Sequence, residues 1–453
     1  MKLKSFFISV FIFLLITVFN INVYSQWVTS GTISNTITYP GVSVVNQNVA
    51  WISGGATTPF IYRTTDGGAT WVSLPTNGLQ AKALMCLWAI DSLTCYVADG
   101  GDAAGATGGD ATLSKTTNGG QNWTAVFNTG GTTGFFNGIV FSRINPLIGV
   151  AESDPPNGTG GAFYLQKTTN GGVNWTLTNP TAVGGTTASG QNSVFIIDNL
   201  FYGFGLNNAA TARITSDGGA TWFSGALGLT GTFTSAIAFQ ENKQVGIAAT
   251  GTSYPNVART TNGGTSWSTV NTGGTGTGVL FSALKWVNGT NTVYYLQQST
   301  TTGLILKSTN AGLNWTSMTA PQDSLFHFDF VRIGTNVTGF AASTNGHILK
   351  LTETVTEISS ENNIIPAEYK LEQNYPNPFN PTTTIKYAIP KSSFVTINIY
   401  DVTGKNIETL VSENKIAGNY DVNFNAAKYS SGVYFYTIRA DSYTDTKKMM
   451  LIK

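Results

Sequence analysis

The amino-acid sequence predicts an all-β protein, in which a seven-bladed β-propeller is followed by a small β-sandwich. Three observations lead to this prediction. A tryptophan-ending motif recurs at a nearly fixed period, short alternating strands fill each period, and the character of the sequence changes before residue 369. Only 10% of the residues are charged while glycine numbers 51, a composition typical of β proteins with many tight turns.

The chain begins with the features of a secretory signal peptide. Two lysines precede a mostly apolar run from Ser5 to Phe19, and Val23 and Ser25 suit the −3 and −1 positions of signal peptidase. We therefore expect residues 1–25 to be removed. An uncleaved membrane anchor is the alternative, but the run is short for a spanning helix, and no later segment is long and apolar enough to span a bilayer.

Charge and cysteine content limit the classes of function. Residues 26–353 contain 12 Lys or Arg and 13 Asp or Glu, so no basic stripe is available for nucleic acid or anionic lipid. Cys86 and Cys95 could form a disulfide in an exported protein. They could equally be two small buried residues on neighbouring strands, and the sequence leaves both alternatives open.

One motif recurs six times along the first part of the chain. The copies are TTDGGATW, TTNGGQNW, TTNGGVNW, TSDGGATW, TTNGGTSW and STNAGLNW, which end at Trp71, Trp123, Trp175, Trp222, Trp267 and Trp315. Successive tryptophans lie 52, 52, 47, 45 and 48 residues apart, a period typical of propeller blades or solenoid units. Each period holds two alternating strands, a polar loop, a third strand, the Asn/Asp-Gly turn and a fourth strand, which together predict one blade.

The last unit predicts how the ring closes. Seven second-strand segments accompany only six copies of the motif, because the unit that reaches Lys350 has none after it. The segment QWVTS after the signal peptide has the pattern of a fourth strand without a blade. We therefore expect Trp27 and its neighbours to supply the outer strand of blade seven, which protects strand edges. The propeller is expected to occupy residues 26–354.

The motif is predicted to be structural rather than catalytic. Its acidic position holds aspartate twice and asparagine four times: Asp66, Asp217, Asn118, Asn170, Asn262 and Asn310. A general acid or base does not exchange with an amide, and six copies around a ring cannot share one substrate. Asp or Asn can instead bond the backbone of its own turn, while glycine supplies a positive φ and tryptophan buries apolar surface.

These copies resemble the Asp-box, or BNR, repeats of sialidase-like and photosystem II assembly-factor-like propellers. The resemblance implies that the box lies in the hairpin between the third and fourth strands, away from the ligand face, and it carries no photosynthetic role to an exported chain. A cation stands three residues before the box acid or amide in five blades, and one residue earlier in the fourth: Arg63, Lys115, Lys167, Arg259 and Lys307, with Arg213 displaced. We interpret this cation as a repeated surface feature, not as a clamp for a substrate carboxylate.

The C-terminal part predicts a separate module after a polar linker at residues 355–368. Four prolines in LEQNYPNPFNPTTTIKYAIP exclude a helix, and the alternating strands that follow predict an Ig-like β-sandwich over residues 369–453. Its motifs resemble the type A C-terminal sorting domain of the Bacteroidetes type IX secretion system: NYPNPFNP, DVTGK with Asp401, Gly404 and Lys405, SSGVYFY with Gly432, and the basic end with Lys447, Lys448 and Lys453.

The resemblance of the C-terminal module implies a route of export and a final location. It implies contact with the type IX secretion machinery, passage through the periplasm and across the outer membrane, and a mature protein that is secreted or anchored at the outer surface. The alternative is an accessory sandwich that binds carbohydrate.

Acidic loops form the first candidate site. A long loop in blade two carries Asp99, Asp102 and Asp110, and the long loop of the neighbouring blade three carries Glu152 and Asp154. Calcium prefers several such oxygens, so Asp99, Asp102 and Asp110 are candidate metal ligands. The spacing lacks the dense alternate acids of an EF-hand loop, and a solvated loop without metal is the alternative.

The segment LFHFDFVRI forms the second candidate site, because His327 and Asp329 share one face of a strand. Such a pair can transfer protons, or it can be a hydrogen-bonded pair between packed blades. A sialidase would need three arginines on its substrate, yet only Arg143 and Arg332 lie outside the repeated positions of the propeller.

The sequence therefore predicts a non-enzymatic binding or scaffold propeller without a cofactor, for a glycan or another envelope protein. No P-loop, nucleophile elbow or zinc motif is present. The alternative is a polysaccharide hydrolase that uses two carboxylates about 5–10 Å apart at the mouth of the ring. Asp99, Asp154 and Asp329 are the residues that could supply them.

Overall fold

The structure, a computed structural model, describes residues 27–33, 41–55, 58–101, 110–130, 134–155, 162–178, 190, 193–207, 209–231, 233–251, 255–274, 282–297, 304–318, 320–321, 324–355, 368–390, 393–415 and 418–452. The expected signal peptide, Asp102 and most of the expected linker lie outside these residues.

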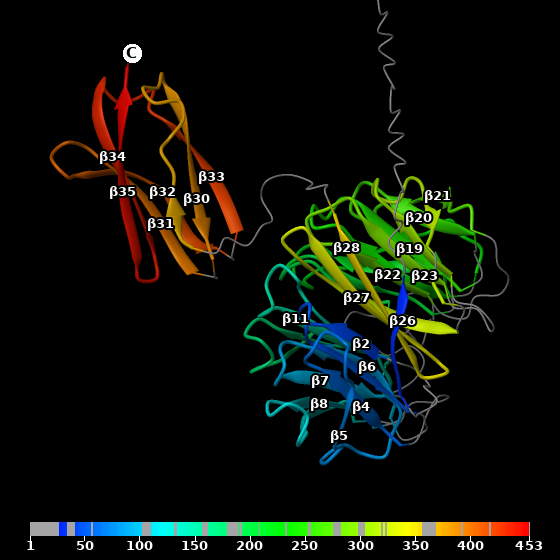
Figure 1. The fold of residues 1–453 in the computed structure, drawn as a ribbon. Helices are drawn as coiled ribbons and strands as arrows, with labels where there is room; N and C mark the ends of the chain where they lie inside the picture. The colour runs from blue at the N-terminus through cyan, green and yellow to red at the C-terminus, as the bar shows by residue number, and fades with distance from the viewer. Residues whose placement is uncertain are drawn as a thin grey trace, which may run out of the picture.

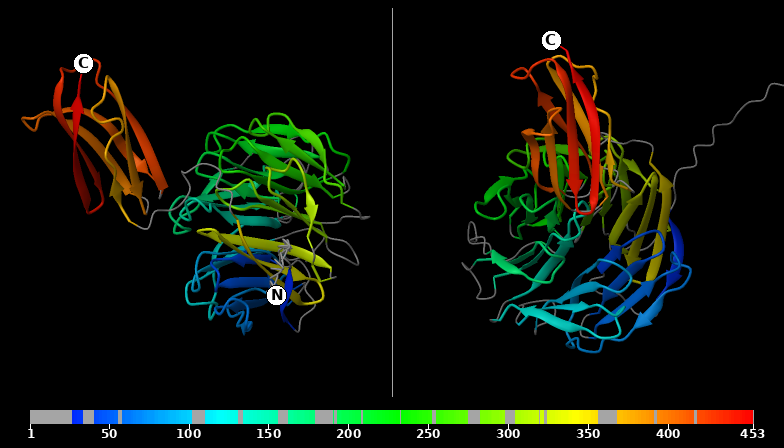
Figure 2. Two further views of the ribbon diagram at one scale, coloured as in Figure 1. Left: turned by 45° about the horizontal axis from the view of Figure 1, so that its top comes forward. Right: turned by 90° about the vertical axis from the view of Figure 1, so that its left-hand side faces the viewer.

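Seven four-stranded antiparallel sheets form the blades of a propeller, within the described part of the chain (Figures 1 and 2). The blades run in chain order: one, β2(Gly41–Val44), β3(Ala50–Gly54), β4(Phe60–Thr64) and β5(Val72–Leu74); two, β6(Leu84–Ala89), β7(Cys95–Asp99), β8(Thr112–Thr116) and β9(Thr124–Asn128); three, β10(Phe136–Phe141), β11(Gly149–Ser153), β12(Tyr164–Thr168) and β13(Thr176–Thr178); four, β14(Phe195–Ile196), β15(Tyr202–Gly205), β16(Thr211–Thr215) and β17(Phe223–Ala226); five, β18(Thr234–Phe239), β19(Gly246–Thr250), β20(Asn256–Thr260) and β21(Ser268–Asn271); six, β22(Ser282–Trp286), β23(Val293–Gln297), β24(Leu304–Ser308) and β25(Thr316–Ser317); seven, β26(Leu325–Ile333), β27(Asn336–Ser343), β28(His347–Thr354) and β1(Val28–Thr32).

The first strand of each blade contacts the first strands of the blades on either side, so these seven strands surround the axis of a closed ring. Buried apolar side chains fill the spaces between successive blades. The all-β class and the seven-bladed ring predicted from the sequence are confirmed.

The N-terminal strand closes the ring, as the sequence predicted. Strand β1 pairs antiparallel with β28, with Val28 opposite Lys350, and Figure 2 shows this blue strand beside the yellow strands of blade seven. Trp27 is 2% exposed, and its ring lies 6.4 Å from that of Phe328 and 5.5 Å from that of Phe330. It belongs to the core between blades six and seven, and so takes the place that a box tryptophan has elsewhere.

The boxes share one set of hydrogen bonds. In blade one, Thr64 Oγ1 donates to Asp66 Oδ1 and accepts from the Gly68 N–H, both at 2.8 Å, while the Thr70 N–H donates to Asp66 Oδ1 at 2.9 Å. The same side-chain oxygen accepts the backbone N–H four residues on in the other boxes, at Asn118, Asn170, Asp217, Asn262 and Asn310. Because the turn needs an oxygen and not a charge, Asp and Asn can exchange there.

The box turn is tied to the turn between the first two strands of its own blade. The Gly67 N–H donates to Asn48 O at 2.9 Å, with a φ of 74° at Gly67. In blade six the equivalent position holds Ala311, which adopts a φ of 57° and donates to Asn291 O at 2.8 Å. The boxes and the turns after the first strands therefore lie on one side of the ring, which we call the box face.

Each box tryptophan packs toward the preceding blade. Trp71 of blade one meets Phe340 of blade seven edge-on at 5.4 Å, and Trp175 of blade three meets Tyr96 of blade two at 5.9 Å. Trp123 is 4% exposed in the core between blades one and two, and its indole N–H donates to Pro75 O at 3.2 Å. The tryptophans therefore act between blades.

The repeated cation points in the opposite direction, toward the following blade. Arg63 lies 5.1 Å from the Trp51 ring centroid and donates to Gly119 O in the box of blade two at 3.1 Å. Lys167 donates to Gly218 O in the box of blade four at 3.1 Å, and Lys350 carries the pattern across the closure to Gly67 O at 2.6 Å. These contacts support a structural role for the cation.

Three blades depart from this pattern. In blade two the hydroxyl of Tyr96, rather than Lys115, donates to the box carbonyl Gly171 O at 3.0 Å. Arg213, the displaced cation, bonds within its own blade to Trp222 O at 3.3 Å and to Ser224 Oγ at 3.1 Å. Lys307 faces blade seven, which has no box, and pairs there with the carboxylate of Glu353 at 2.8 and 2.9 Å. A carboxylate thus replaces the box carbonyl where the box is missing.

The C-terminal residues form two sheets on a common core. One holds β29(Lys370–Leu371), β30(Thr382–Ile389) and β33(Gly418–Asn425); the other holds β31(Ser393–Tyr400), β32(Asn406–Lys415), β34(Gly432–Ala440) and β35(Tyr443–Leu451). Ile385 and Phe424 of the first sheet and Ile397 and Ile438 of the second are all fully buried in that core. The two sheets and their common core form a β-sandwich.

The motifs of the C-terminal module support one another. Tyr436, from SSGVYFY, accepts the Asn374 N–H at 2.8 Å through its hydroxyl and donates to Glu372 O at 2.7 Å. Asp401 Oδ1 accepts the N–H groups of Thr403 and Lys405, which shapes the DVTGK turn. The contacts of Tyr436 fix the proline-rich segment at the start of the module to β34, an inner strand of the second sheet.

The closure of the ring predicts a large effect of Trp27→Ala. Removal of this buried ring should lower the free energy of unfolding by about 3–5 kcal/mol, because the core between blades six and seven would keep a cavity. Val28→Ala is the matched control, since Val28 is 53% exposed, and should cost less than about 0.5 kcal/mol. Denaturant unfolding of both variants checks this, and similar losses would contradict the assigned role of Trp27.

The boxes also predict a dependence of stability on pH. Hydrogen bonds from Thr70 and Thr221 lower the pKa values of Asp66 and Asp217 to about 2, from a usual 3.8. A lowered folded-state pKa gives stability that is present above pH 3.8 and is lost as the pH falls through about 2.

The double variant Asp66→Asn/Asp217→Asn should therefore lose less stability than the wild type between pH 4 and pH 2, while it folds normally at pH 7. Thermal unfolding across this pH range measures the difference. Asp66→Ala is the control, since it lacks the side-chain oxygen and should be destabilised at every pH. Parallel pH curves for the double variant and the wild type would contradict the prediction.

Candidate functional site

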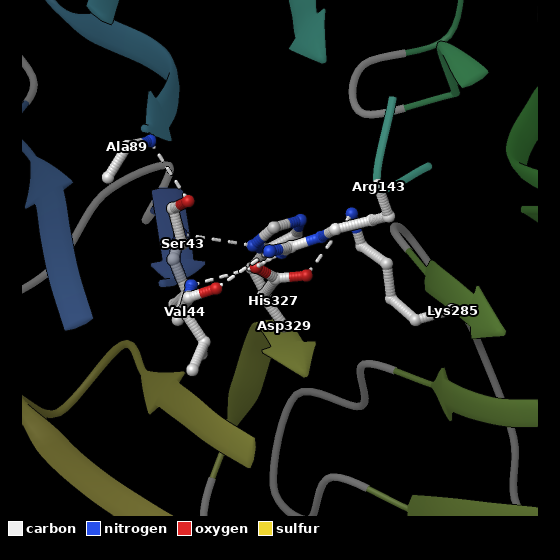
Figure 3. A network of polar contacts seen from close by, with 8 residues as sticks. Ser43, Val44, Ala89, Arg143, Lys285, His327 and Asp329 are labelled. Carbon is white, nitrogen blue, oxygen red and sulfur yellow. Dashed lines mark hydrogen bonds and ion pairs between the residues drawn. The ribbon is translucent and has the colours of Figure 1, made fainter. Parts of the chain in front are cut away.

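Two polar side chains of β26 lie at the axis of the ring. His327 and Asp329 are buried, 6% and 2% exposed, and both face strand β2 of blade one (Figure 3). The Val42 N–H donates to His327 Nδ1 at 3.1 Å, and the Val44 N–H donates to Asp329 Oδ2 at 2.8 Å. Each side chain thus bonds blade one, and this arrangement agrees with the alternative of a bonded pair between packed blades.

Two cations reach Asp329 from distant blades. Arg143 follows β10 in blade three; it donates to Val44 O at 2.8 Å and forms an ion pair with Asp329 Oδ2. Lys285 lies in β22 of blade six, and its Nζ is 3.9 Å from Asp329 Oδ1. Figure 3 shows both side chains extending toward the carboxylate. The contacts join blades one, three, six and seven across the ring.

An indole of blade two completes this group, which we call the axial cluster: Trp88, Arg143, Lys285, His327 and Asp329. The Arg143 guanidinium lies 4.5 Å from the Trp88 ring centroid, and Lys285 Nζ lies 5.8 Å from it. Trp88 thus contacts both cations through its negative face.

Burial and neighbouring charges set the protonation states of the cluster. Burial alone would raise the pKa of Asp329, but Arg143, Lys285 and the Val44 N–H lower it below its usual value, so the carboxylate is ionised. Burial, together with the charge of Lys285, lowers the pKa of His327 to about 3, so this imidazole is neutral. Burial lowers the pKa of Lys285, and the charge of Asp329 acts in the opposite direction.

A hollow adjoins the axial cluster. Two neighbouring pockets of about 100 and 250 Å³ share Trp88, Arg143, Trp286, Val287, Asn288 and Phe330, and we call them together the axial pocket. Their walls include the turns that follow the first strands, at Ile144, Ile197 and Gln240. The axial pocket therefore lies toward the box face. The loops that the sequence favoured for ligand contact, after the second strands, lie toward the opposite face.

The acids predicted on those loops have structural contacts. Asp99 pairs with Leu84 at the start of β6, and its Oδ1 accepts the N–H groups of Gly101 and Thr112, both at 3.0 Å. Asp154 Oδ1 accepts from the Asn137 amide at 2.6 Å.

The structure therefore does not bring the three catalytic candidates together, because Asp99 ends the second strand β7 and Asp154 follows the second strand β11, toward the face opposite the axial pocket. Among the described residues, no group of three or more His, Cys, Asp or Glu is placed to hold a metal ion. The described metal candidates do not form such a group, and Asp102 lies outside the described residues.

The two cysteines are separate free thiols. Cys86 packs in the core between blades two and three, and Cys95 packs in the core between blades one and two. Burial raises the pKa values of both thiols, so neither is an activated nucleophile. Of the two alternatives, the structure shows the pair of buried small residues.

Sequence reasoning did not single out Lys285 or Trp88. The sequence did contain a signal for Lys285. It is a charged residue in the first strand SALKW, at the position where the first strand of the neighbouring blade, TSAIAF, has Ala238. Arg143 was recognised only as an arginine outside the repeated positions. Nothing in the sequence indicated that these residues, with Asp329, meet at one point.

The comparisons with known proteins follow the two parts of the chain. Residues 373–453 match the family described as the secretion system C-terminal sorting domain. No curated protein matches the chain. Similar solved structures include YCF48 from Cyanidioschyzon merolae, with a TM-score of 0.50 and 18% identity over 72% of this chain and 99% of that one.

Two further solved structures extend the comparison. YCF48 bound to D1 peptide has a TM-score of 0.52 and 15% identity over 73% of this chain and 96% of that chain. An ancestral GH74 enzyme has a TM-score of 0.54 and 12% identity over 94% of this chain and 63% of that chain. At such low identity, the likeness shows the fold alone.

The chain therefore combines a β-propeller with a C-terminal segment that matches the secretion system C-terminal sorting domain. The sorting domain indicates export, to the cell surface or beyond it. Within the residues that the structure describes, no helix combines the length and the apolar character needed to cross a membrane.

The axial cluster predicts a large cost for Asp329→Asn. The amide keeps the shape of the side chain but leaves two cations without their carboxylate, which should lower the free energy of unfolding by about 3 kcal/mol. Lys243→Met is the control, because it breaks an ion pair with Asp198 in which both side chains are about one third exposed, and should cost less than about 1 kcal/mol. Equal losses in denaturant unfolding would show that Asp329 is not needed to balance the cluster.

Proposed function

We propose that this exported propeller is a binding or scaffold protein rather than an enzyme, and that its ligand is a glycan or another envelope protein. The observation that carries the proposal is the state of the three candidate catalytic acids. Asp99 accepts a hydrogen bond from the Thr112 N–H and Asp154 from the Asn137 amide, and Asp329 balances two cations. Asp329 lines the axial pocket, whereas Asp99 and Asp154 lie at the ends of second strands, toward the opposite face.

The protonation of Asp329 also argues against glycoside hydrolysis. A glycosidase needs one carboxylic acid whose raised pKa keeps its proton for the leaving group. The pKa of Asp329 is shifted in the opposite direction by Arg143 and Lys285. The two box acids, Asp66 and Asp217, have pKa values near 2 and lie in separate blades, so they cannot supply that proton either.

The proposed route of export uses both ends of the chain. Residues 1–25 act as a signal peptide for the inner membrane, residues 26–354 are the cargo, residues 355–368 are a linker and residues 369–453 engage the type IX machinery. The match at residues 373–453 supports the last of these roles. The sorting domain is then removed, and the propeller is anchored or released outside the cell.

The test measures hydrolysis and binding on the same samples. The purified full chain is incubated with plant, algal and host polysaccharides, and new reducing ends are measured together with retention on each immobilised polysaccharide and on an outer-membrane fraction. We expect no new reducing ends and retention by at least one glycan or by the envelope fraction.

Two outcomes contradict the proposal. Reducing ends that appear with the wild type and disappear in folded Asp99→Asn, Asp154→Asn or Asp329→Asn variants would make the chain a polysaccharide hydrolase. Absence of both hydrolysis and retention would remove the binding role. Circular dichroism of each variant separates loss of activity from loss of fold.

A further inference from the structure

The charges around the axial pocket do not balance. Its described walls contain three cations, Arg143, Lys285 and Arg332, and two acids, Glu241 and Asp329. The imidazole of His327 beside them is neutral. One positive charge is therefore in excess around a hollow whose other walls are largely apolar.

The three cations differ in how their donors are used. Arg143 bonds Val44 O and Asp329, while Arg332 donates to Gly334 O at 2.8 Å and to Asn288 O at 2.7 Å. Among the residues that the structure describes, the ammonium of Lys285 contacts only Asp329, in an ion pair at 3.9 Å that is beyond hydrogen-bond distance, and the face of the Trp88 indole.

An ammonium carries three hydrogen-bond donors, and burial without acceptors is costly to it. The Lys285 side chain is 26% exposed, so it is accessible from the pocket. An acceptor that enters the pocket can therefore take up hydrogen bonds that the described residues do not provide to this group.

The volume and the lining of the axial pocket limit the size and the polarity of a ligand that can bind in it. Trp88, Trp286 and Phe330 give flat aromatic surface, and Ile144 and Ile197 add aliphatic surface. Pockets of about 100 and 250 Å³ lie below the roughly 300–1,000 Å³ of sites for drug-sized ligands. One ring-sized unit or one chain end fits this space.

We propose that the axial pocket binds a single carboxylate carried on a ring-shaped or apolar body, with Lys285 as the anchoring cation, Arg143 beside it and Trp88 as the flat wall. The excess of one positive charge and the presence of Glu241 favour one negative charge over two. Two sources offer this chemistry, a uronate unit of an acidic glycan and a small organic acid. The inference rests on the proposed binding function and names the ligand class of its axial site.

The experiment compares charged ligands with uncharged counterparts of the same shape. The full chain is titrated by ligand-observed NMR with glucuronate and benzoate, and with glucose and benzamide. We expect the preferred acid to bind at least about tenfold more tightly than its uncharged counterpart, as a charge-assisted hydrogen bond requires. Whether glucuronate or benzoate binds distinguishes the two sources.

Variants then test the assigned anchor. Lys285→Met should remove the preference for the acid, and Lys285→Arg should keep most of it. Lys243→Met, a lysine of blade five outside the pocket walls, is the matched control and should bind as the wild type does. Thermal unfolding of each variant shows that the ring is intact.

Three results would overturn the inference: no binding of either acid, equal binding of acids and uncharged counterparts, or a preference that persists in folded Lys285→Met. Retention of the protein on polysaccharide or on the envelope fraction, measured in the assay of the proposed function, distinguishes failure of this inference from failure of the proposed function. If retention persists while the acids fail to bind, the propeller binds its ligand elsewhere; if retention is also absent, the proposed function itself fails.

Discussion

The ring depends on the contact in which the box loop of one blade completes the blade before it. A blade is a small sheet with two apolar faces, and it is stable only when neighbours cover both of them. The box tryptophan covers the preceding blade, as Trp175 covers Tyr96, and the preceding blade sends a cation to the box backbone, as Arg63 does to Gly119. Apolar packing and polar contacts thus join the same pair of blades.

Blade seven shows that the contact is required and the motif is not. No box follows its third strand, yet the interface with blade six is complete. Trp27 comes from the other end of the propeller to fill the apolar part, and the Glu353 carboxylate receives Lys307 in place of a box carbonyl. Two residues 326 positions apart in the chain therefore reproduce what one eight-residue motif does elsewhere.

The sequence could predict this architecture because its signals are local and repeated. The box oxygen, the turn glycines and the tryptophan lie within eight residues, and seven second-strand segments in phase with the six boxes set the number of blades. The unmatched Trp27 then indicated the closure. The sorting domain was equally readable, since NYPNPFNP and SSGVYFY are contiguous motifs that the fold brings together at Asn374 and Tyr436.

The axial cluster could not be predicted in the same way. Arg143, Lys285 and Asp329 are single, unrepeated residues from three blades, and only ring closure brings them together. The alternation of apolar and polar residues in LFHFDFVRI predicted that His327 and Asp329 share one strand face, but it did not indicate the three other residues of the axial cluster. The loops that were expected to contact a ligand also carry acids. The Asp99 carboxylate, however, accepts hydrogen bonds from two backbone N–H groups, and the composition of the loop does not reveal such local contacts.

The cost of the axial cluster is the strongest reason to connect it with a ligand. Buried ion pairs are often no more stable than apolar side chains of the same volume, so a charged cluster at the axis is not explained by the stability of the ring. The interfaces between blades already hold the ring together without it. Asp329 balances Arg143 closely, but Lys285 adds a second cation at 3.9 Å with no carboxylate of its own. A purely structural cluster would be better balanced with an apolar residue at this position, as the neighbouring blade has, whereas a lysine that faces a hollow is suited to meet an anion from outside.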